Sequence, residues 1–219
     1  MTTLVEELLL LAFDDTTGRD RSGGHLELGL AGAIVLELTM AGRLDVADKK
    51  VRVIDTSPVG DPVLDGRLAA IAADKPRAPK SVVERTAKGL KQAVLAALVA
   101  DGVLRHRRDT ALGIFPVHRY LPNDPAAEAD ARARLGAAVD AGEAADARTA
   151  ALAVLVYALR LERVAFPGRK AGPTRKALKA VAEGSWAGEA TRQAVDAAQA
   201  AVMAAVIAAT AAATAAGGS

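Results

Sequence analysis

The segment Thr149–Leu159, with the sequence TAALAVLVYAL, is apolar on every side when it is drawn as a helix. A helix without a polar face has no side to turn toward water, so other parts of the chain must enclose it. The segment Glu27–Ala41 is almost as apolar, and Gly42 follows it at a position that suits the end of a helix. The sequence therefore predicts a helical protein whose central helices are covered by the rest of the chain.

The core around these helices must be built mainly from small side chains. Of the 219 residues 52 are alanine, whereas aromatic residues amount to only 3%. Charged residues make up 25%, a usual share for a globular protein, and the net charge is +2. This balance excludes a disordered chain and a uniformly basic, histone-like protein. The length favours one compact domain over residues 1–219.

Apolar spacing and turn residues predict the remaining elements. Leucines repeat at helical spacing near the N-terminus, and apolar and charged residues alternate after Gly42 and again after Gly102, as in β-hairpins. The predicted fold class is mainly α: a single compact helical domain with buried central helices, surrounding amphipathic helices and one or two β-hairpins. We expect helices at 3–13, 63–73, 81–102 with a possible break at Gly89, 125–141, from 173 or 174 onward, and 188–215, and hairpins at 44–54 and 103–122.

The chain contains no cysteine, which excludes disulfides, thiolate zinc sites and a cysteine nucleophile. This composition suits a reducing cytoplasm. Glu6 and Glu7 lie where a signal peptide would need a basic start and an unbroken apolar stretch, so export is not expected. The apolar run Ala200–Ala216 is about as long as a membrane span, but it is nearly all alanine and threonine, and we interpret it as a soluble helix.

Five segments occur in a characteristic order: LVEELLLLAFDD, GLAGAIVLELTMAGRL, SPVGDPVLD, ALVADGVL and RTAALAVLVYAL. Together they resemble the Golgi phosphoprotein 3 family, peripheral membrane proteins of eukaryotes with relatives in bacteria, and this chain looks like a bacterial relative. The resemblance covers nearly the whole chain. It implies a mainly helical domain that binds phosphatidylinositol 4-phosphate and inserts an apolar hairpin into the bilayer, without catalysis. In eukaryotes these proteins retain glycosyltransferases in the Golgi, which implies a protein cargo.

The resemblance also implies a phosphate pocket, which the family builds from a tryptophan and an arginine near the second helix and from two later arginines three residues apart. The first pair falls near Ser22 and on Ala31, neither of which can supply those contacts. The second pair falls on Lys88 and Lys91. Only the positive charge is retained there, because lysine lacks the bidentate fork of arginine.

Arg19 and Arg21, in the loop before the second helix, can substitute for the missing contacts. Because Ser22 and Ala31 cannot supply the family's contacts, the sequence does not predict selectivity for one phosphoinositide. General anionic lipids are as good candidates for the ligand as phosphatidylinositol 4-phosphate. The basic N-terminal tail with which the family recruits vesicle coat is missing from this sequence.

Positive charge is concentrated between Lys75 and Arg108. This stretch holds nine basic residues against Glu84 and Asp101, a local balance of +7. On one continuous helix, positions 85, 88 and 91 share a broad face, and such a face attracts an anionic bilayer by ~1 kcal/mol for each lysine or arginine. The alternative is an ordinary solvated face.

The predicted second hairpin combines charge with apolar side chains. Charge and insertion together would hold a domain on lipid where neither term alone suffices. The alternative is that the apolar residues pack on the core or on a neighbouring subunit. The hairpin residues predicted to face the membrane are Arg105, Arg107 and Arg108 before the turn and Leu112, Ile114 and Phe115 near its tip.

The sequence offers little for catalysis. His25, His106 and His118 are scattered, and each is better explained as a surface or hairpin residue than as a metal ligand. No nucleophile-elbow or zinc-protease motif occurs. The basic segment 163–176 can grip phosphates at a helix start or serve as a structural loop, but its glycine spacing does not match a nucleotide P-loop. We expect no enzyme, no metal and no cofactor.

The favoured hypothesis is a peripheral membrane protein on the cytoplasmic, inner face of a membrane, where it binds anionic phospholipid head groups and acts as an adaptor. Its partners would be the membrane surface, a protein cargo and possible further copies of itself. One alternative is a winged-helix nucleic-acid binder, because helices and a basic hairpin also form that layout. The balanced charge disfavours nucleic acid. Another alternative is an oligomeric scaffold with the hairpin between subunits.

Overall fold

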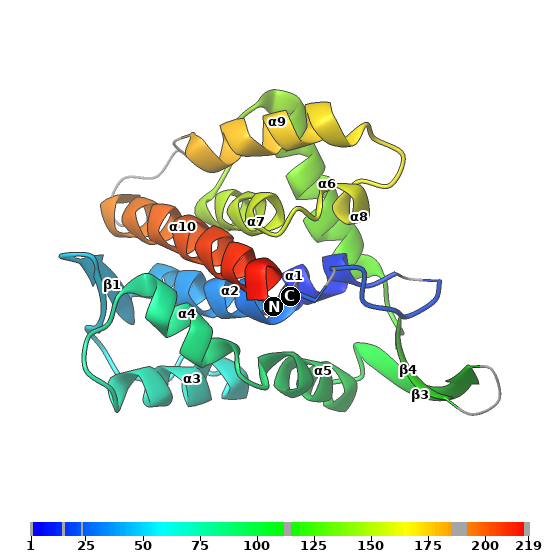
Figure 1. Ribbon diagram of the computed structural model, residues 1–219, viewed down its shortest axis with the longest axis horizontal. Helices are drawn as coiled ribbons and strands as arrows, with labels where there is room; N and C mark the ends of the chain where they lie inside the picture. The colour runs from blue at the N-terminus through cyan, green and yellow to red at the C-terminus, as the bar shows by residue number, and fades with distance from the viewer. Residues whose placement is uncertain (1, 15, 23, 112–114, 185–191, 217–219) are drawn as a thin grey trace.

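The computed structural model describes residues 2–14, 16–22, 24–111, 115–184 and 192–216. The chain is 62% helical, and two small antiparallel hairpins complete it within the described residues (Figure 1). This confirms the mainly α fold class. The helices are α1 (Leu4–Ala12), α2 (Leu26–Met40), α3 (Pro62–Ala72), α4 (Pro79–Ala87), α5 (Leu90–Ala100), α6 (Ala126–Ala141), α7 (Ala147–Ala158), α8 (Glu162–Ala165), α9 (Ala171–Glu183) and α10 (Arg192–Ala216); the hairpins are β1 (Leu44–Ala47) with β2 (Lys50–Val53) and β3 (Leu104–Ala111) with β4 (Phe115–Pro122).

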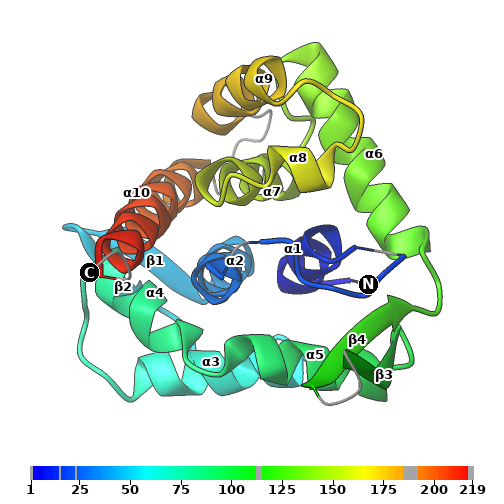
Figure 2. The same ribbon diagram turned by 45° about the vertical axis from the view of Figure 1, so that its right-hand side comes forward.

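The helices are arranged in layers around α1 and α2. Figure 2 shows these two helices between α7 and α10 on one side and α3 and α5 on the other. Helix α2 contacts α1, α4, α7 and α10, and most of its side chains are buried. Helix α7 is buried along nearly its whole length. The predicted central position of both apolar segments is therefore confirmed.

Local signals in the sequence set several helix ends. Thr3 and Glu6 form a capping box at the start of α1: the Thr3 hydroxyl accepts from the Glu6 amide at 3.3 Å, and the Glu6 carboxylate accepts from the Thr3 amide at 2.7 Å. At the start of α7 the Asp146 carboxylate accepts from the Thr149 amide at 2.7 Å. Such caps satisfy amide groups that have no partner within the helix.

The helical stretch expected over 81–102 is divided into two helices, and the break lies at Gly89, as the sequence allowed. Gly89 adopts a left-handed conformation with φ of 65°, so α4 ends at Ala87 and α5 begins at Leu90. A left-handed residue reverses the local winding and ends the hydrogen-bond ladder, and glycine adopts this conformation without steric cost. Helix α9 begins at Ala171, two or three residues before the predicted start at 173 or 174. Pro173 lies within its first turn, where a missing amide hydrogen costs no helical bond.

Two glycines let α2 approach its neighbours closely. A Cβ atom on Gly29 would lie 2.2 Å from Leu159 Cδ1, and one on Gly32 would lie 2.8 Å from Val202 Cγ1. The contacts join α2 to the end of α7 and to α10. Small residues in α2 therefore set the spacing of the central helices.

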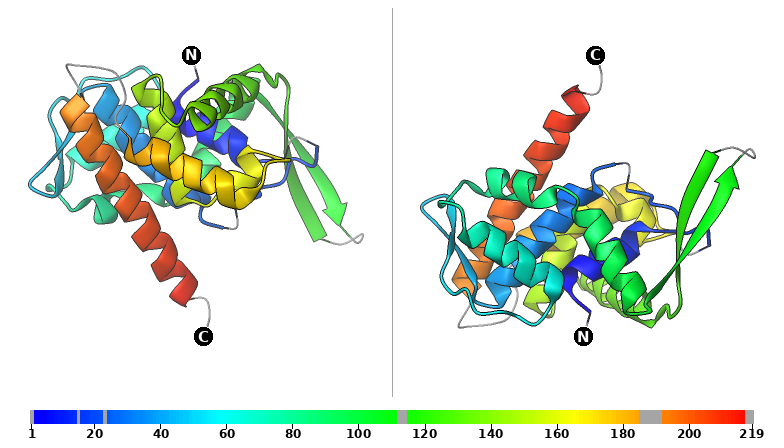
Figure 3. Two further views of the ribbon diagram at one scale, coloured as in Figure 1. Left: turned by 90° about the horizontal axis from the view of Figure 1, so that it is seen from above. Right: turned by 90° about the horizontal axis from the view of Figure 1, so that it is seen from below.

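Helix α10 buries one stripe of its surface and projects beyond the helical body at its C-terminal end (Figure 3). The stretch Val195–Ala212 has a mean hydropathy of 1.6 and is 39% buried, so by length and composition it is long enough to cross a membrane. Core helices of soluble proteins share these properties. Its buried residues recur every three or four positions and face α2, α4 and α7: Val195, Ala198, Val202, Ala205, Val206 and Ala209.

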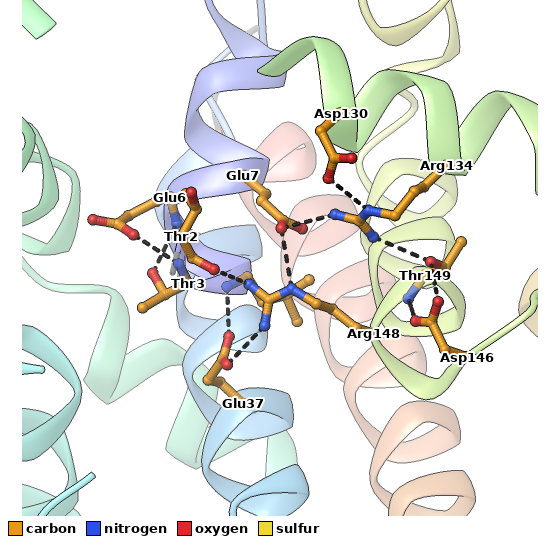
Figure 4. Close-up of polar contacts among 11 residues, drawn as sticks. Thr2, Thr3, Glu6, Glu7, Glu37, Asp130, Arg134, Asp146, Arg148 and Thr149 are labelled. Atoms are coloured by element: carbon orange, nitrogen blue, oxygen red, sulfur yellow. Dashed lines mark hydrogen bonds and ion pairs between the residues drawn. The ribbon is translucent and has the colours of Figure 1, made fainter. Parts of the chain in front are cut away.

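A network of charges around the buried Glu7 ties four helices together, as Figure 4 shows. Arg148 of α7 donates to Glu7 of α1 at 3.0 Å and to Glu37 of α2 at 2.9 Å. Arg134 of α6 donates to the same Glu7 oxygen at 2.8 Å. Burial alone would lower the pKa of Arg148, but the charges of Glu37 and Glu7 outweigh it and raise that pKa above its ordinary value. The network keeps the buried Glu7 and the half-buried Glu37 paired with arginine.

We expect Gly32→Ala to destabilise the protein by about 1–3 kcal/mol, because the added methyl group overpacks the contact between α2 and α10. Gly66→Ala is the matched control, since Gly66 lies in helix α3 with open space around it. There the change should stabilise by about 0.5–1 kcal/mol through the lower entropy of alanine in the unfolded chain. Urea unfolding of both variants measures the difference. Equal effects of the two substitutions would contradict the packing role.

Arg148→Ala should cost about 1–3 kcal/mol, because it leaves the buried Glu7 with Arg134 alone and takes the cation from the half-buried Glu37. Thermal and urea unfolding would measure this loss. Lys179→Ala is the control: it removes a cation from the exposed pair with Glu183 on α9 and should change stability little. If both variants unfold at the same urea concentration, the buried network does not stabilise the fold.

Candidate functional site

Lys91, in the first turn of α5, is held against the loop that follows α1. Its ammonium group lies 2.5 Å from Asp20 Oδ2 and 5.6 Å from the centroid of the Phe13 ring. The contact joins segments 71 residues apart in the sequence. We call Phe13, Asp20, Ser22 and Lys91 the Lys91 cluster.

Asp20 is the centre of the Lys91 cluster. Its Oδ1 accepts from the Ser22 amide at 2.8 Å and from the Ser22 hydroxyl at 2.5 Å, while Oδ2 accepts from Lys91. Burial would raise the pKa of Asp20, but the hydrogen bonds from Lys91 and Ser22 outweigh it and hold the pKa below 3.8. Positions 22 and 91, which the resemblance assigned to one pocket, are therefore joined through a single carboxylate.

The foot of the second hairpin packs against the Lys91 cluster. The edge of the Phe13 ring meets Tyr120 of β4, with 6.0 Å between the centroids. The Tyr120 amide donates to the Gly18 carbonyl at 3.0 Å. Gly18 has φ of 62°, and a Cβ atom there would lie 2.8 Å from the Tyr120 nitrogen, so glycine permits this approach.

Aromatic rings continue along the hairpin from Tyr120. The His106 ring stacks on Tyr120 with a centroid distance of 4.8 Å and on His118 at 5.1 Å. A ring nitrogen of His106 lies 2.8 Å from one of His118, so a hydrogen bond here requires one of them to carry no proton. Both histidines lie on the hairpin, as the sequence predicted. The contacts form a path from Lys91 through Phe13 and Tyr120 out along the strands.

The hairpin arginines lie on opposite faces. Cross-strand pairs place Arg107 opposite Arg119 and Arg108 opposite His118, and successive residues of a strand alternate in direction. Asp109 lies 3.3 Å from Arg107 Nε and 2.7 Å from Arg119 Nε, which neutralises part of their charge. Arg105 and Arg108 are exposed and form no ion pair within the described part of the chain. Arg105 shares the face of Arg107.

The predicted apolar tip can be placed only in part. Leu112 and Ile114 lie outside the described residues. Phe115 is the first residue of β4, and its backbone pairs with Ala111, but its side chain is not among those described. The register puts the turn at the far end of the hairpin from Tyr120. The hairpin itself projects from the helical body (Figure 3).

Positions 85, 88 and 91 do not share a helical face, contrary to the prediction. Lys88 is exposed and directly follows the last residue of α4, and its carbonyl accepts from Arg67 of α3 at 3.2 Å. Arg85 lies 3.6 Å from Asp74, in another part of the molecule. The break at Gly89 separates Arg85 from Lys91 by changing the direction of the chain.

The other predicted residues occupy distinct surroundings. Arg19 is exposed in the loop before α2, and Arg21, with 59% of its side chain exposed, lies 3.5 Å from Asp14. Ala31 is fully buried in α2, so no side chain reaches the loop from this position. Among the described residues no group of histidine and carboxylate side chains could hold a metal ion.

The sequence interpretation missed Phe13, Asp20 and Tyr120. Asp20 lies between two arginines, and its partner was not apparent because Lys91 is distant in the sequence. A local signal was present for the rings. His118 and Tyr120 are two residues apart in β4 and therefore point to the same face of the hairpin. His106 lies opposite Tyr120 on β3 and shares that face.

Residues 4–198 match the family model described as Golgi phosphoprotein 3, GPP34. The chain belongs to this family. Membership supports a membrane function associated with phosphatidylinositol 4-phosphate at the level of the family. The matched range includes the Lys91 cluster and the whole second hairpin.

Asp20→Asn should destabilise the protein by about 1–3 kcal/mol at neutral pH, because Lys91 loses its charged partner and Ser22 a strong acceptor. The folded pKa of Asp20 lies below its unfolded value of 3.8. Its contribution is therefore complete above pH 3.8 and is lost as the pH falls through the folded pKa. Urea unfolding at stepwise lower pH measures it. A difference between variant and parent that stays constant through this range would contradict the assignment.

Proposed function

We propose that this protein is a peripheral membrane protein that binds anionic phospholipid head groups at the Lys91 cluster and dips the tip of its second hairpin into the bilayer. The observation that carries the proposal is the contact path from Lys91 through Phe13 and Tyr120 to the hairpin strands. A cation that binds a head group would thus lie at the foot of the element that enters the lipid.

Electrostatics support this role. Lys88, Arg105 and Arg108 are exposed, and no ion pair within the described residues neutralises them. Each such cation near an anionic surface contributes ~1 kcal/mol, and the attraction weakens as salt is added. Lys91 is paired with Asp20, so a phosphate must compete with that carboxylate for the ammonium group. A head group with more than one negative charge competes best, which favours phosphoinositides over singly charged lipids.

Apolar insertion supplies the second part of the interaction. Leu112 and Ile114 fall between the two strands of this hairpin in the sequence, and Phe115 is the first residue of β4. Cations alone hold a domain on a membrane only weakly and reversibly, and a few inserted apolar side chains add to that affinity. We propose that the protein acts without catalysis as an adaptor for a protein cargo, on the cytoplasmic face of a membrane.

Vesicle flotation tests the proposal. The full chain should float with vesicles that contain phosphatidylinositol 4-phosphate or phosphatidylglycerol and remain behind with neutral phosphatidylcholine. Lys88→Gln and Lys91→Gln should each weaken binding about fivefold, which corresponds to ~1 kcal/mol. Lys176→Gln is the matched control, because this exposed lysine lies on α9, away from the hairpin (Figure 1). Asp20→Asn should strengthen binding by freeing Lys91.

The double variant Ile114→Asp with Phe115→Asp tests insertion in the same assay. It should abolish flotation while its circular dichroism spectrum stays that of the parent. Undiminished flotation of the folded double variant would exclude insertion. If duplex DNA displaces the protein from vesicles, a nucleic-acid binder is favoured instead. If light scattering shows an oligomer for the parent and a monomer for the double variant, an oligomeric scaffold is favoured.

A further inference from the structure

A second group of cations surrounds a cavity at the other end of the molecule. The cavity has a volume of about 490 Å³ and lies between strand β2, helices α3 and α4 and the link that joins these helices. In Figure 1 the first hairpin and α4 lie at one end of the long axis, and the second hairpin lies at the other. The volume is within the range of cavities that bind small ligands.

Hydrogen bonds close the cavity on two sides. The Val51 amide of β2 donates to the Arg77 carbonyl at 2.8 Å, which holds the link between α3 and α4 against the hairpin. Arg77 donates to Asp74 at 2.5 and 2.9 Å within that link. On the other side, Arg67 of α3 donates to the Lys88 carbonyl at the end of α4. The walls are thus built into the fold.

The floor of the cavity is apolar. Val51 and Val82 are 2% and 6% exposed, and Val53 and Ile71 are half-buried. These side chains come from β2, α3 and α4. An apolar group placed on them would leave water and gain ~0.8 kcal/mol for each buried methylene.

The rim of the cavity is strongly basic. Arg52, Arg67, Lys75, Arg77 and Arg85 line it, against the single carboxylate of Asp74. The hydrogen bond from Arg77 is the main reason that the pKa of Asp74 falls to about 2, so this carboxylate is ionised at neutral pH.

Most of this positive charge is not neutralised. Arg52 pairs with Asp48 at 2.5 Å, outside the cavity, and Arg77 pairs with Asp74. Arg85 approaches Asp74 only to 3.6 Å with 60% of its side chain exposed. Arg67 uses one of its donors on a carbonyl, and Lys75 forms no ion pair among the described residues. Donors for an anion therefore remain around an apolar floor.

We propose that this cavity binds a small amphiphilic anion, a phosphate or carboxylate attached to an alkyl chain, with the acidic group held by Arg67, Lys75 and Arg85. The alkyl chain lies on Val82 and Ile71. A neutral lipid would leave the basic residues of the lining without an anion. A bare polyanion would leave the apolar residues of the lining without an apolar partner. The site is separate from the Lys91 cluster and does not depend on the proposed membrane function.

Isothermal titration of the full chain with octyl phosphate, octanol and inorganic phosphate tests the proposal. Octyl phosphate should bind at least about tenfold more tightly than either of the others, because it alone combines charge-assisted hydrogen bonds with apolar burial. If inorganic phosphate binds as tightly as octyl phosphate, the apolar floor contributes nothing and the proposal fails. If octanol binds as tightly, the cationic rim contributes nothing and it fails equally.

Variants locate the binding. The double variant Arg67→Gln with Arg85→Gln should weaken octyl phosphate binding at least about tenfold through the lost charge-assisted bonds. Ile71→Trp should abolish it by filling the cavity, and Ile71 is half-buried, so the fold can accept the change. Lys80→Gln is the control, because Lys80 lies on α4 outside the cavity lining and pairs with Glu84. Parental binding by a folded Ile71→Trp variant would overturn the proposal.

The amphiphile can come from solution or from a bilayer, and flotation separates these sources. If the Arg67 and Arg85 double variant binds octyl phosphate weakly and also floats less with phosphatidic acid vesicles, the ligand is drawn from the membrane. If its flotation equals that of the parent, the ligand is a dissolved amphiphile. Lys91→Gln should leave octyl phosphate binding unchanged, which separates a failure of this site from a failure of the proposed membrane site.

Discussion

Enclosure of α2 on all sides is the constraint on which the rest of the structure depends. This helix has no polar face, so α1, α3, α4, α5, α7 and α10 all pack around it. Gly29 and Gly32 let two of them approach closely enough to exclude water. Glu27 and Glu37 are the charged residues of α2, and Arg148 pairs both with the half-buried Glu37 and with the buried Glu7 of α1. Burial of Glu7 without a cation would be costly, so its pairing with Arg148 favours the docking of α1 on α7.

The break at Gly89 then decides where positive charge appears. In the sequence, basic residues from Lys75 to Arg108 form one stretch. In the structure, Lys75, Arg77 and Arg85 line the cavity beside β2 and α3, whereas Lys91 lies beside the loop after α1 and the foot of the second hairpin. One left-handed residue therefore converts a predicted continuous face into two separate cationic regions. They have different chemical surroundings: an apolar cavity at one end and an aromatic path to a projecting hairpin at the other.

In the proposed function, Asp20 gives the Lys91 cluster a property that the Lys91 ammonium group alone would not have. A carboxylate already holds Lys91, so weakly charged ligands gain little by replacing it. A strongly charged head group gains more, because the ammonium group exchanges one anion for another of higher charge. This competition is a physical route to selectivity in a chain whose family pocket positions hold Ser22, Ala31 and two lysines in place of the aromatic and guanidinium groups.

Five ordered segments of the sequence pointed to the family, whereas apolar periodicity and turn residues, which act over a few residues, predicted the mainly helical fold and the burial of α2 and α7. It also placed both hairpins. Only the tertiary structure decided that Lys91 meets Asp20, that Phe13 and Tyr120 connect this pair to the hairpin, and that Arg85 belongs to a different region. The sequence allowed a break at Gly89, but contacts between distant segments depend on how the helices dock, and no local pattern of residue types encodes that docking.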